Sequence, residues 1–236
     1  MGVHDAPAWL LTAFVRSTQE AGATAPVEEV RRRGEELLAR WSDPERTFHN
    51  LRHLADVLMR VDELAEETHE PDLVRLAAWY HGAVFDAGWK RDAQRRGGED
   101  EHASALLAQQ ELLALGVPEK RAQRVHDLVA TLWRHAPDPA DVDCSVLCDA
   151  DLAMLAAEPQ RYKTYVQALR AEYAHVPTED FLRARLRIVH KLLERPRLFA
   201  SPLGAGWEEP ARQNLAAEEQ RLRKELDALL AQPAQA

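Results

Sequence analysis

Long stretches rich in alanine, leucine, glutamate and arginine constrain the fold of this chain more than any other feature of the sequence. These residues favour helices, and runs of β-branched residues with the alternation of a half-buried strand are hard to find. Prolines stand at or near the expected helix starts, where the missing N–H costs little: Pro26, Pro71, Pro118, Pro159 and Pro177. The sequence therefore predicts an all-α fold.

The spacing of apolar residues predicts nine or ten helices joined mostly by short connections. Leu51, Leu54, Leu58 and Val61 show the spacing clearly, because residues three and four apart share one helix face. The expected helices cover residues 6–20, 26–41, 50–68, 71–81, 100–115, 118–135, 144–157, 159–174, 178–194 and 208–231. The longest connection, 82–99, contains glycines and alternating charges and is a candidate lid. We expect a single bundle over residues 1–236, with 232–236 as a frayed tail.

The charge balance restricts the partners of the chain. Its 236 residues include 30 Lys and Arg against 39 Asp and Glu, a net charge of -9. This excess argues against general nucleic-acid binding. No apolar run approaches the ~18 residues of a membrane span. The start of the sequence lacks a basic leader, and the two cysteines, Cys144 and Cys148, form no disulfide scaffold, so we expect a cytoplasmic protein.

Three histidine and aspartate clusters are candidates for chemistry. His49 and His53 are four residues apart and would share a helix face, and His81 closes an apolar helix. Asp149 and Asp151 lie in an apolar stretch, where carboxylates need a cation or many hydrogen bonds. Imidazole and carboxylate ligands together suit a divalent ion such as Mn, Fe, Co, Ni or Zn. Hydrogen-bonded histidines in the core are the alternative reading of these clusters.

Six stretches in the same order resemble the HD superfamily of metal-dependent phosphohydrolases. They are FHNLRH (48–53), LAAWYHGAVFD (76–86), DEHASA (100–105), LCDADLAMLA (147–156), RYKTYVQALRAEYAHVP (161–177) and ARQNLAAEE (211–219). The resemblance covers residues 45–220 and implies an HD-domain-like bundle with His53, His81 and Asp151 as metal ligands. It further implies that a divalent ion (Mn, Fe, Co, Ni, Zn or Mg) activates water to hydrolyse a small phosphoester or nucleotide.

The chain departs from the family pattern at the second motif, which reads His81-Gly82 where the family has His-Asp. Glycine offers no ligand, so the resemblance leaves three protein ligands, enough for one catalytic ion with water. A bridged pair of ions is hard to reconcile with this loss. In DEHASA, His102 stands where the family tends to have glutamate, and it is either a substitute ligand or a surface change.

Other polar residues are candidates for catalysis. Asp86 is a substitute ligand, a general base or a turn residue. His49 contacts the substrate phosphate or a second ion, or it is only a residue at a helix start. Asp149 orients a ligand or caps a helix. Further candidates for a second metal or for substrate contacts are His135, Glu101, His102 and Arg52.

Two functions from different classes remain open at this point. The first is the metal-dependent phosphohydrolase, and the second is a degenerate relative that lost metal binding at Gly82 and binds a ligand or a protein. An HD-type iron oxygenase is a third reading, disfavoured by Gly82 because it needs two bridged irons. The apolar residues near the start of the chain belong to a homodimer contact or cap the core: Trp9, Leu10, Leu11, Phe14 and Val15.

Overall fold

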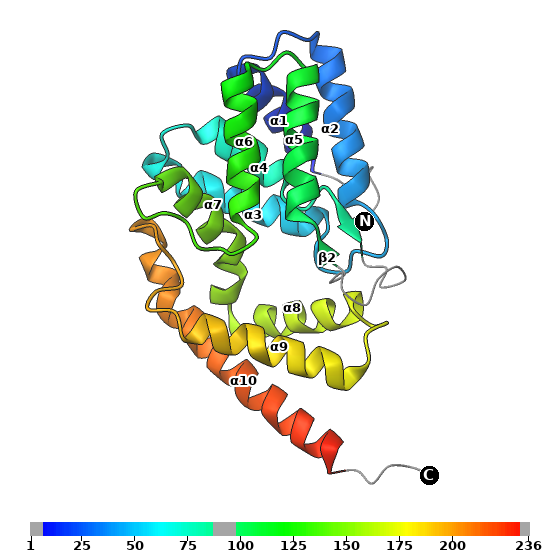
Figure 1. The fold of residues 1–236 in the computed structure, drawn as a ribbon, viewed down its shortest axis with the longest axis vertical. Helices are drawn as coiled ribbons and strands as arrows, with labels where there is room; N and C mark the ends of the chain where they lie inside the picture. Colours follow the sequence, from blue (N-terminus) through cyan, green and yellow to red (C-terminus); the bar gives the residue numbers. More distant parts are fainter. Residues whose placement is uncertain (1–6, 87–97, 232–236) are drawn as a thin grey trace.

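The computed structural model describes residues 7–86 and 98–231, and ten α-helices occupy most of them (Figure 1). The helices are α1 (Ala8–Glu20), α2 (Val27–Trp41), α3 (Leu51–Glu63), α4 (Pro71–Tyr80), α5 (Glu101–Ala114), α6 (Glu119–Thr131), α7 (Val142–Leu152), α8 (Pro159–Glu172), α9 (Thr178–Leu193) and α10 (Glu208–Leu230). Three short 3-10 helices join them: η2 (Ala65–Glu67), η4 (Ala153–Ala156) and η5 (Leu203–Trp207). The predicted all-α fold is confirmed.

The prolines mark helix starts as predicted. Pro71 and Pro159 are the first residues of α4 and α8, and Pro26, Pro118 and Pro177 directly precede α2, α6 and α9. The expected helix over 118–135 was too long: α6 ends at Thr131. The chain then turns to His135, whose φ of 44° places it in the left-handed region that breaks a helix.

A small hairpin, which the sequence did not predict, joins the two ends of the 82–99 connection. Strands β1 (Phe85–Asp86) and β2 (Gly98–Glu99) pair antiparallel, with Phe85 opposite Glu99. The Val84 N–H donates to Ser104 Oγ at 3.0 Å, which anchors this hairpin to α5. The remainder of the predicted lid, 87–97, and the predicted tail, 232–236, lie outside the described residues.

The buried apolar side chains form two clusters. The first lies in the upper bundle of Figure 1 and includes Trp41, Trp79 and Tyr80. The second lies among η4, α8, α9 and α10 below it and includes Tyr162. Trp207 is partly buried and packs against both clusters. The molecule thus has an upper and a lower part, and the candidate site described below lies between them.

The apolar residues of α1 mostly face the first cluster. Leu10, Phe14 and Val15 are buried, and the Phe14 ring packs edge-on to Trp79 with 5.0 Å between ring centroids. Trp9 is 41% exposed. Packing in the core therefore accounts for most of the apolar residues of α1. The homodimer contact stays a prediction.

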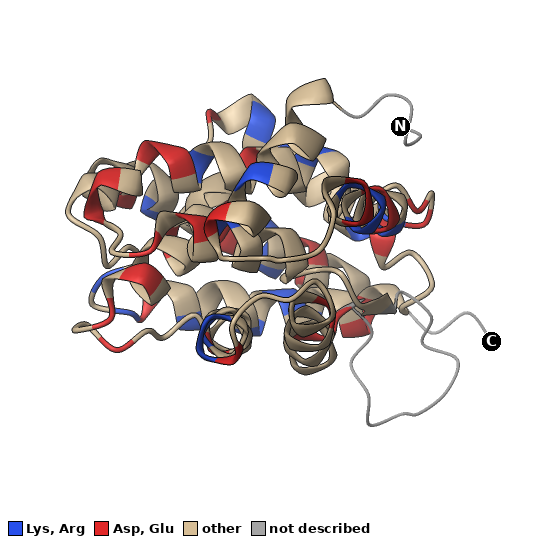
Figure 2. Ribbon diagram, turned by 90° about the horizontal axis from the view of Figure 1, so that it is seen from above, with Lys and Arg blue, Asp and Glu red and all other residues tan. Residues whose placement is uncertain are grey.

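Acidic and basic residues are interspersed over the helices (Figure 2). Several form pairs one helical turn apart, such as Arg183 with Glu179 at 2.8 Å. Such exposed pairs add little stability but spread the charge over the surface. No helix of the described residues combines the length and the hydrophobicity that crossing a bilayer requires.

Candidate metal centre

Three of the predicted ligands meet at one point. His53 lies in the first turn of α3, His81 directly follows α4, and Asp151 lies near the end of α7. The Nε2 atoms of the two histidines are 3.1 Å apart. Asp151 Oδ1 lies 3.3 Å from Nε2 of His53 and 3.7 Å from Nε2 of His81. Three helices packed in the first cluster therefore aim two imidazoles and a carboxylate at a common space.

His81 is held in the orientation that a metal ligand needs. Its side chain is buried, and its Nδ1–H donates to the carbonyl oxygen of Ala78 at 2.6 Å. This bond leaves the lone pair of Nε2 pointing toward His53 and Asp151. Burial lowers the pKa of His81 to about 4, so the ring is neutral near pH 7. A neutral imidazole fixed through its other nitrogen is the usual state of a metal-binding histidine.

His135 orients Asp151. Its Nε2–H donates to Asp151 Oδ2 at 2.6 Å, which turns Oδ1 toward His53 and His81. Burial would raise the pKa of Asp151, but the hydrogen bonds from His135 and His53 hold it well below its usual range. The carbonyl oxygen of His135 accepts a hydrogen bond from Arg195 at 2.9 Å, which stabilises its left-handed backbone. Backbone strain of this kind is common at functional sites.

The structure adds Glu99, a residue that the sequence did not indicate. Strand β2 places Glu99 Oε1 3.9 Å from His81 Nε2, and ligand atoms of His53, His81 and Glu99 all lie within 4.8 Å of one another. Glu99 Oε1 is buried and has no hydrogen-bond partner within residues 7–86 and 98–231. Burial and the charge of Asp151 raise the pKa of Glu99 to about 8. An ionised carboxylate in this position requires a cation.

Glycine at position 82 is required by the packing around it. A Cβ atom built on Gly82 would lie 2.5 Å from Cη2 of Trp41 and 2.7 Å from Oε1 of Glu99. Trp41 is fixed by a 3.0 Å hydrogen bond from its Nε1–H to the carbonyl oxygen of Trp79. Glu99 and Trp41 therefore fill the space that a side chain at position 82 would need.

The Arg46 side chain holds this arrangement together. Its Nη1 donates to the carbonyl oxygen of Gly82 at 2.6 Å. The guanidinium carbon lies 5.1 Å from the ring centroid of Trp41 and 4.8 Å from that of Phe85, within the range of cation–π attraction. Arg46 thus links the chain after α2, the residue after His81 and strand β1.

His49 lies beside the centre and is tied to Glu172 at the end of α8. Its Nδ1 donates to Glu172 Oε1, and its Nε2 lies 3.8 Å from Glu99 Oε2. Glu172 Oε2 accepts the N–H groups of Phe48 and His49 at 2.9 and 3.0 Å. Burial would raise the pKa of Glu172, but these hydrogen bonds lower it. The sequence did not indicate Glu172, whose only signal is a glutamate inside the RYKTYVQALRAEYAHVP stretch.

Asp149 has a different position from the one expected. Its two oxygens accept the N–H groups of Ala200 and Ser201 at 2.9 and 2.7 Å, so it binds the backbone that leads into η5. Asp149 and Asp151 are two residues apart on α7, and side chains at this spacing do not share a helix face. Asp149 therefore extends in a different direction from Asp151. These contacts are neither those of a residue that orients a metal ligand nor those of a helix N-cap, the two roles expected for Asp149.

The remaining predicted residues are spread around the centre. Glu101 is half-buried at the start of α5, and burial together with Asp100 and Asp151 raises its pKa although nearby His135 opposes this. His102 and Arg52 are exposed, which favours the surface reading of His102. Asp86 belongs to β1 by its backbone, and its side chain lies outside the described residues.

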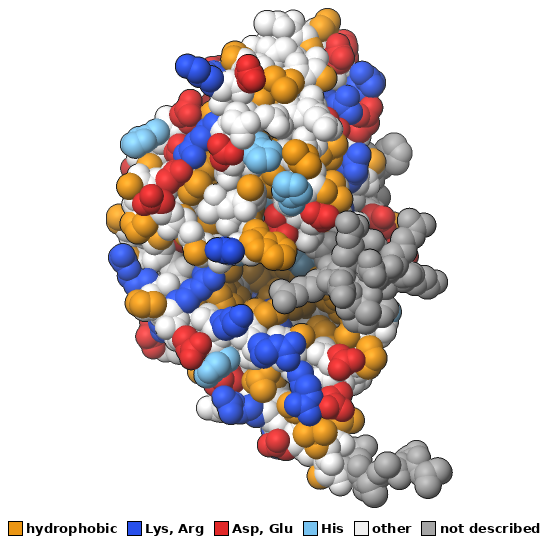
Figure 3. Space-filling view, in the orientation of Figure 1, with side chains coloured by type: hydrophobic (Ala, Val, Ile, Leu, Met, Phe, Trp, Pro, Cys, Tyr) orange, Lys and Arg blue, Asp and Glu red, His pale blue; other side chains and the backbone are white. Residues whose placement is uncertain are grey.

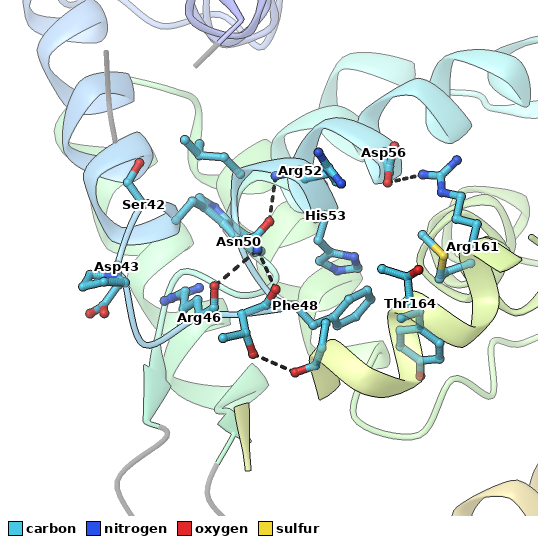
Figure 4. A pocket seen from close by; sticks show the side chains of 17 residues that line it. Ser42, Asp43, Arg46, Phe48, Asn50, Arg52, His53, Asp56, Arg161 and Thr164 are labelled. Atoms are coloured by element: carbon cyan, nitrogen blue, oxygen red, sulfur yellow. Dashed lines mark hydrogen bonds and ion pairs between the residues drawn. The ribbon is translucent and has the colours of Figure 1, made fainter. Parts of the chain in front are cut away.

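Two large cavities and one narrow pocket of about 20 Å³ border the centre in the described part of the chain. The polar cavity, about 530 Å³, lies between the segment after α2, α3 and α8 (Figure 4). His53 is on its wall, and an ion pair between Asp56 and Arg161 joins α3 to α8 at one edge of it. The apolar cavity, about 480 Å³, is lined by His53 and by four other residues of the centre: His49, Glu99, His135 and Asp151. It opens on the face shown in Figure 3, where hydrophobic side chains line a hollow.

The four converging donors fit a divalent ion. Two imidazole nitrogens and two carboxylates are ligands that Mn, Fe, Co, Ni and Zn accept. The buried Glu99 oxygen, which accepts no hydrogen bond from the described part of the chain, is the observation that best fits a cation at this point. No protein-family model, curated protein or solved structure matches this chain. The interpretation of the site therefore depends on its own geometry.

Proposed function

We propose that the protein is a metal-dependent phosphohydrolase that acts on a small phosphoester. The observation that carries this proposal is the convergence of His53, His81 and Asp151 within 3.7 Å of one another. These are the three residues that the resemblance to the HD superfamily marks as ligands, and they come from three separate stretches of the chain. Both cysteines are free thiols, which fits a reducing compartment, so we place the activity in the cytoplasm.

Four side chains would hold the ion: His53, His81, Asp151 and Glu99. Glu99 supplies the carboxylate that Gly82 lacks, from a strand rather than from the residue after the histidine. A bound divalent ion polarises a phosphoryl oxygen and lowers the pKa of a water molecule. His135 keeps the Asp151 carboxylate turned toward the two imidazoles throughout.

His49 is the group placed to move a proton. Its Nδ1–H is committed to Glu172, which leaves Nε2 free to accept a proton beside Glu99. A histidine held in one tautomer by a carboxylate is an effective general base. In this proposal His49 takes a proton from the attacking water, and Glu172 stabilises the imidazolium that forms.

The alternative is a degenerate module that binds a ligand without catalysis. Loss of metal binding at Gly82 was the reason for this alternative. The position of Glu99 restores a carboxylate to the site, and this contact favours the enzyme over the degenerate module.

His81→Ala tests the proposal. We expect about one divalent ion per chain in the purified wild type. In the variant we expect metal affinity to fall by more than about 100-fold, which is a larger loss than the removal of a residue that only orients a ligand would cause. Elemental analysis and hydrolysis of 4-nitrophenyl phosphate measure the two effects. His102→Ala is the matched control. Because His102 is exposed, this variant should keep the metal affinity and the hydrolytic activity of the wild type. A wild type without metal refutes the proposal, and metal without hydrolysis supports the binding module.

Glu99→Gln tests the added ligand. The amide keeps the size of the side chain but removes the charge, so we expect metal affinity to fall by about 10-fold or more. Metal titration followed by calorimetry measures the change. Glu101→Gln removes a half-buried carboxylate near the centre and should change affinity less. Equal losses in the two variants would show a general charge effect rather than ligation by Glu99.

A further inference from the structure

The apolar cavity joins the candidate metal centre to a wall of hydrophobic side chains. Its inner end holds the donors Glu99 and Asp151. From there it extends between the upper and lower parts of the molecule. The walls are made mainly of apolar and aromatic residues from α7 to α9: Leu152, Leu155, Tyr165, Leu169, Phe181 and Ile188. A molecule that reaches the centre through this cavity would therefore touch carbon atoms over most of its length.

The charge of the described walls does not suit a highly anionic ligand. Among the described lining residues Arg185 is the one arginine or lysine, and it is already paired. Its Nε and Nη2 donate to Glu218 at 2.8 and 3.0 Å, and its guanidinium carbon lies 5.4 Å from the Tyr165 ring centroid. A paired and stacked guanidinium is a part of the wall rather than a free phosphate ligand.

The polar cavity is the contrasting case. It shares His53 with the apolar cavity, but of the two cavities Glu99 and Asp151 line the apolar one. Asp151 also lines a pocket beside the polar cavity, but at about 20 Å³ this pocket is too small for an organic group. A substrate whose phosphorus lies against the carboxylate side of the centre therefore has its remaining atoms in the apolar cavity. The volume of about 480 Å³ is in the usual range for pockets that bind small molecules.

We propose that the substrate is a phosphoester whose organic group is apolar or aromatic and occupies this cavity. The inference rests on the proposed function, because it places the phosphate at the metal centre. Burial of apolar surface, rather than charge pairing with the remainder of the ligand, then supplies most of the selectivity. The apolar group contacts α9, and the phosphate contacts the side chains that extend from α3, α7 and β2.

Two phosphonates that cannot be hydrolysed provide the test. Calorimetry on the full-length protein, loaded with the ion that it binds, compares 3-phenylpropylphosphonate with methylphosphonate. These probes share the anionic head and differ in the apolar group, so we expect the first to bind at least about tenfold more tightly. Ile188→Asp, at a half-exposed position of the cavity wall, should reduce that ratio severalfold. Leu113→Asp, at a similarly exposed leucine on α5, should leave it unchanged.

The outcomes separate this inference from the proposed function. Equal affinity for the two phosphonates, or a preference for methylphosphonate, overturns the inference even if the protein binds metal and hydrolyses phosphoesters. A preference that Leu113→Asp reduces as much as Ile188→Asp also overturns it, because the apolar contact then lies elsewhere. Metal content, measured on the same samples, decides the proposed function independently of these affinities.

Discussion

Replacing Gly82 by aspartate, the residue of the HD motif, is expected to destabilise the protein without improving its metal affinity. The new Cβ would lie 2.5 Å from Trp41 Cη2 and 2.7 Å from Glu99 Oε1, and Trp41 is fully buried. Overpacking of this kind costs about 1–3 kcal/mol of unfolding free energy. The added carboxylate would also compete with Glu99 for the same position. The number of carboxylates at the ion would then stay the same, so metal affinity should not rise. Urea unfolding and metal titration measure the two effects.

Gly206→Asp is the matched control for this substitution. A Cβ at Gly206 meets no atom within 4 Å, so the same change should leave stability and metal affinity close to the wild type. Gly82→Ala should lose stability as Gly82→Asp does, because the clash begins at Cβ. A Gly82→Asp protein with wild-type stability and tighter metal binding would contradict the assignment of Glu99, since it would show that Trp41 and Glu99 move aside freely.

Replacing Arg185 by methionine is expected to produce the largest loss of stability. The Arg185 and Glu218 side chains are 8% and 1% exposed, and Glu218 also accepts a hydrogen bond from the Tyr162 hydroxyl. Methionine keeps much of the packing but leaves Glu218 as a buried charge without its cation. Breaking a buried ion pair from one side costs about 3–5 kcal/mol. Urea unfolding monitored by circular dichroism measures the loss.

Two further variants isolate the cause. Arg183→Met lies on the same helix and removes an exposed pair with Glu179, so its cost should stay below about 1 kcal/mol. The double variant Arg185→Met/Glu218→Gln removes both charges and keeps a hydrogen-bonding group for Tyr162. We expect it to recover much of the lost stability. A double variant as unstable as Arg185→Met alone would show that packing of the guanidinium on Tyr165, not charge, dominates.

Much of the fold follows from local rules that operate within one helix. A proline before or at the first residue of a helix and apolar residues three and four apart were enough to predict α2, α4, α8 and α9 within two residues at each end. The end of α6 was not predictable in this way. Its last turn is replaced by the left-handed residue His135, which is stabilised by Arg195, 60 residues further along the chain.

The candidate site was predictable only in part. His53, His81 and Asp151 could be grouped because each lies in a short stretch that resembles a known motif. Glu99 could not be grouped with them, because its position depends on a hairpin of two-residue strands that no periodicity reveals. Asp149 and Asp151 look alike in the sequence. The two differ in the direction of the side chain on α7. The backbone N–H groups of residues 200 and 201 donate hydrogen bonds to Asp149, and Asp151 faces the two histidines.

The division of the buried side chains into two clusters has an evolutionary consequence. The histidines and carboxylates of the centre extend from elements packed in the upper part, whereas Phe181, Ala184 and Ile188 of α9 line the cavity from the lower part. Under the proposed function, substitutions on this face of α9 would alter which molecule is selected without disturbing the side chains of the candidate metal centre. A lineage of proteins with this proposed activity could change its substrates while the candidate centre stays the same, and directed evolution could begin at these three positions.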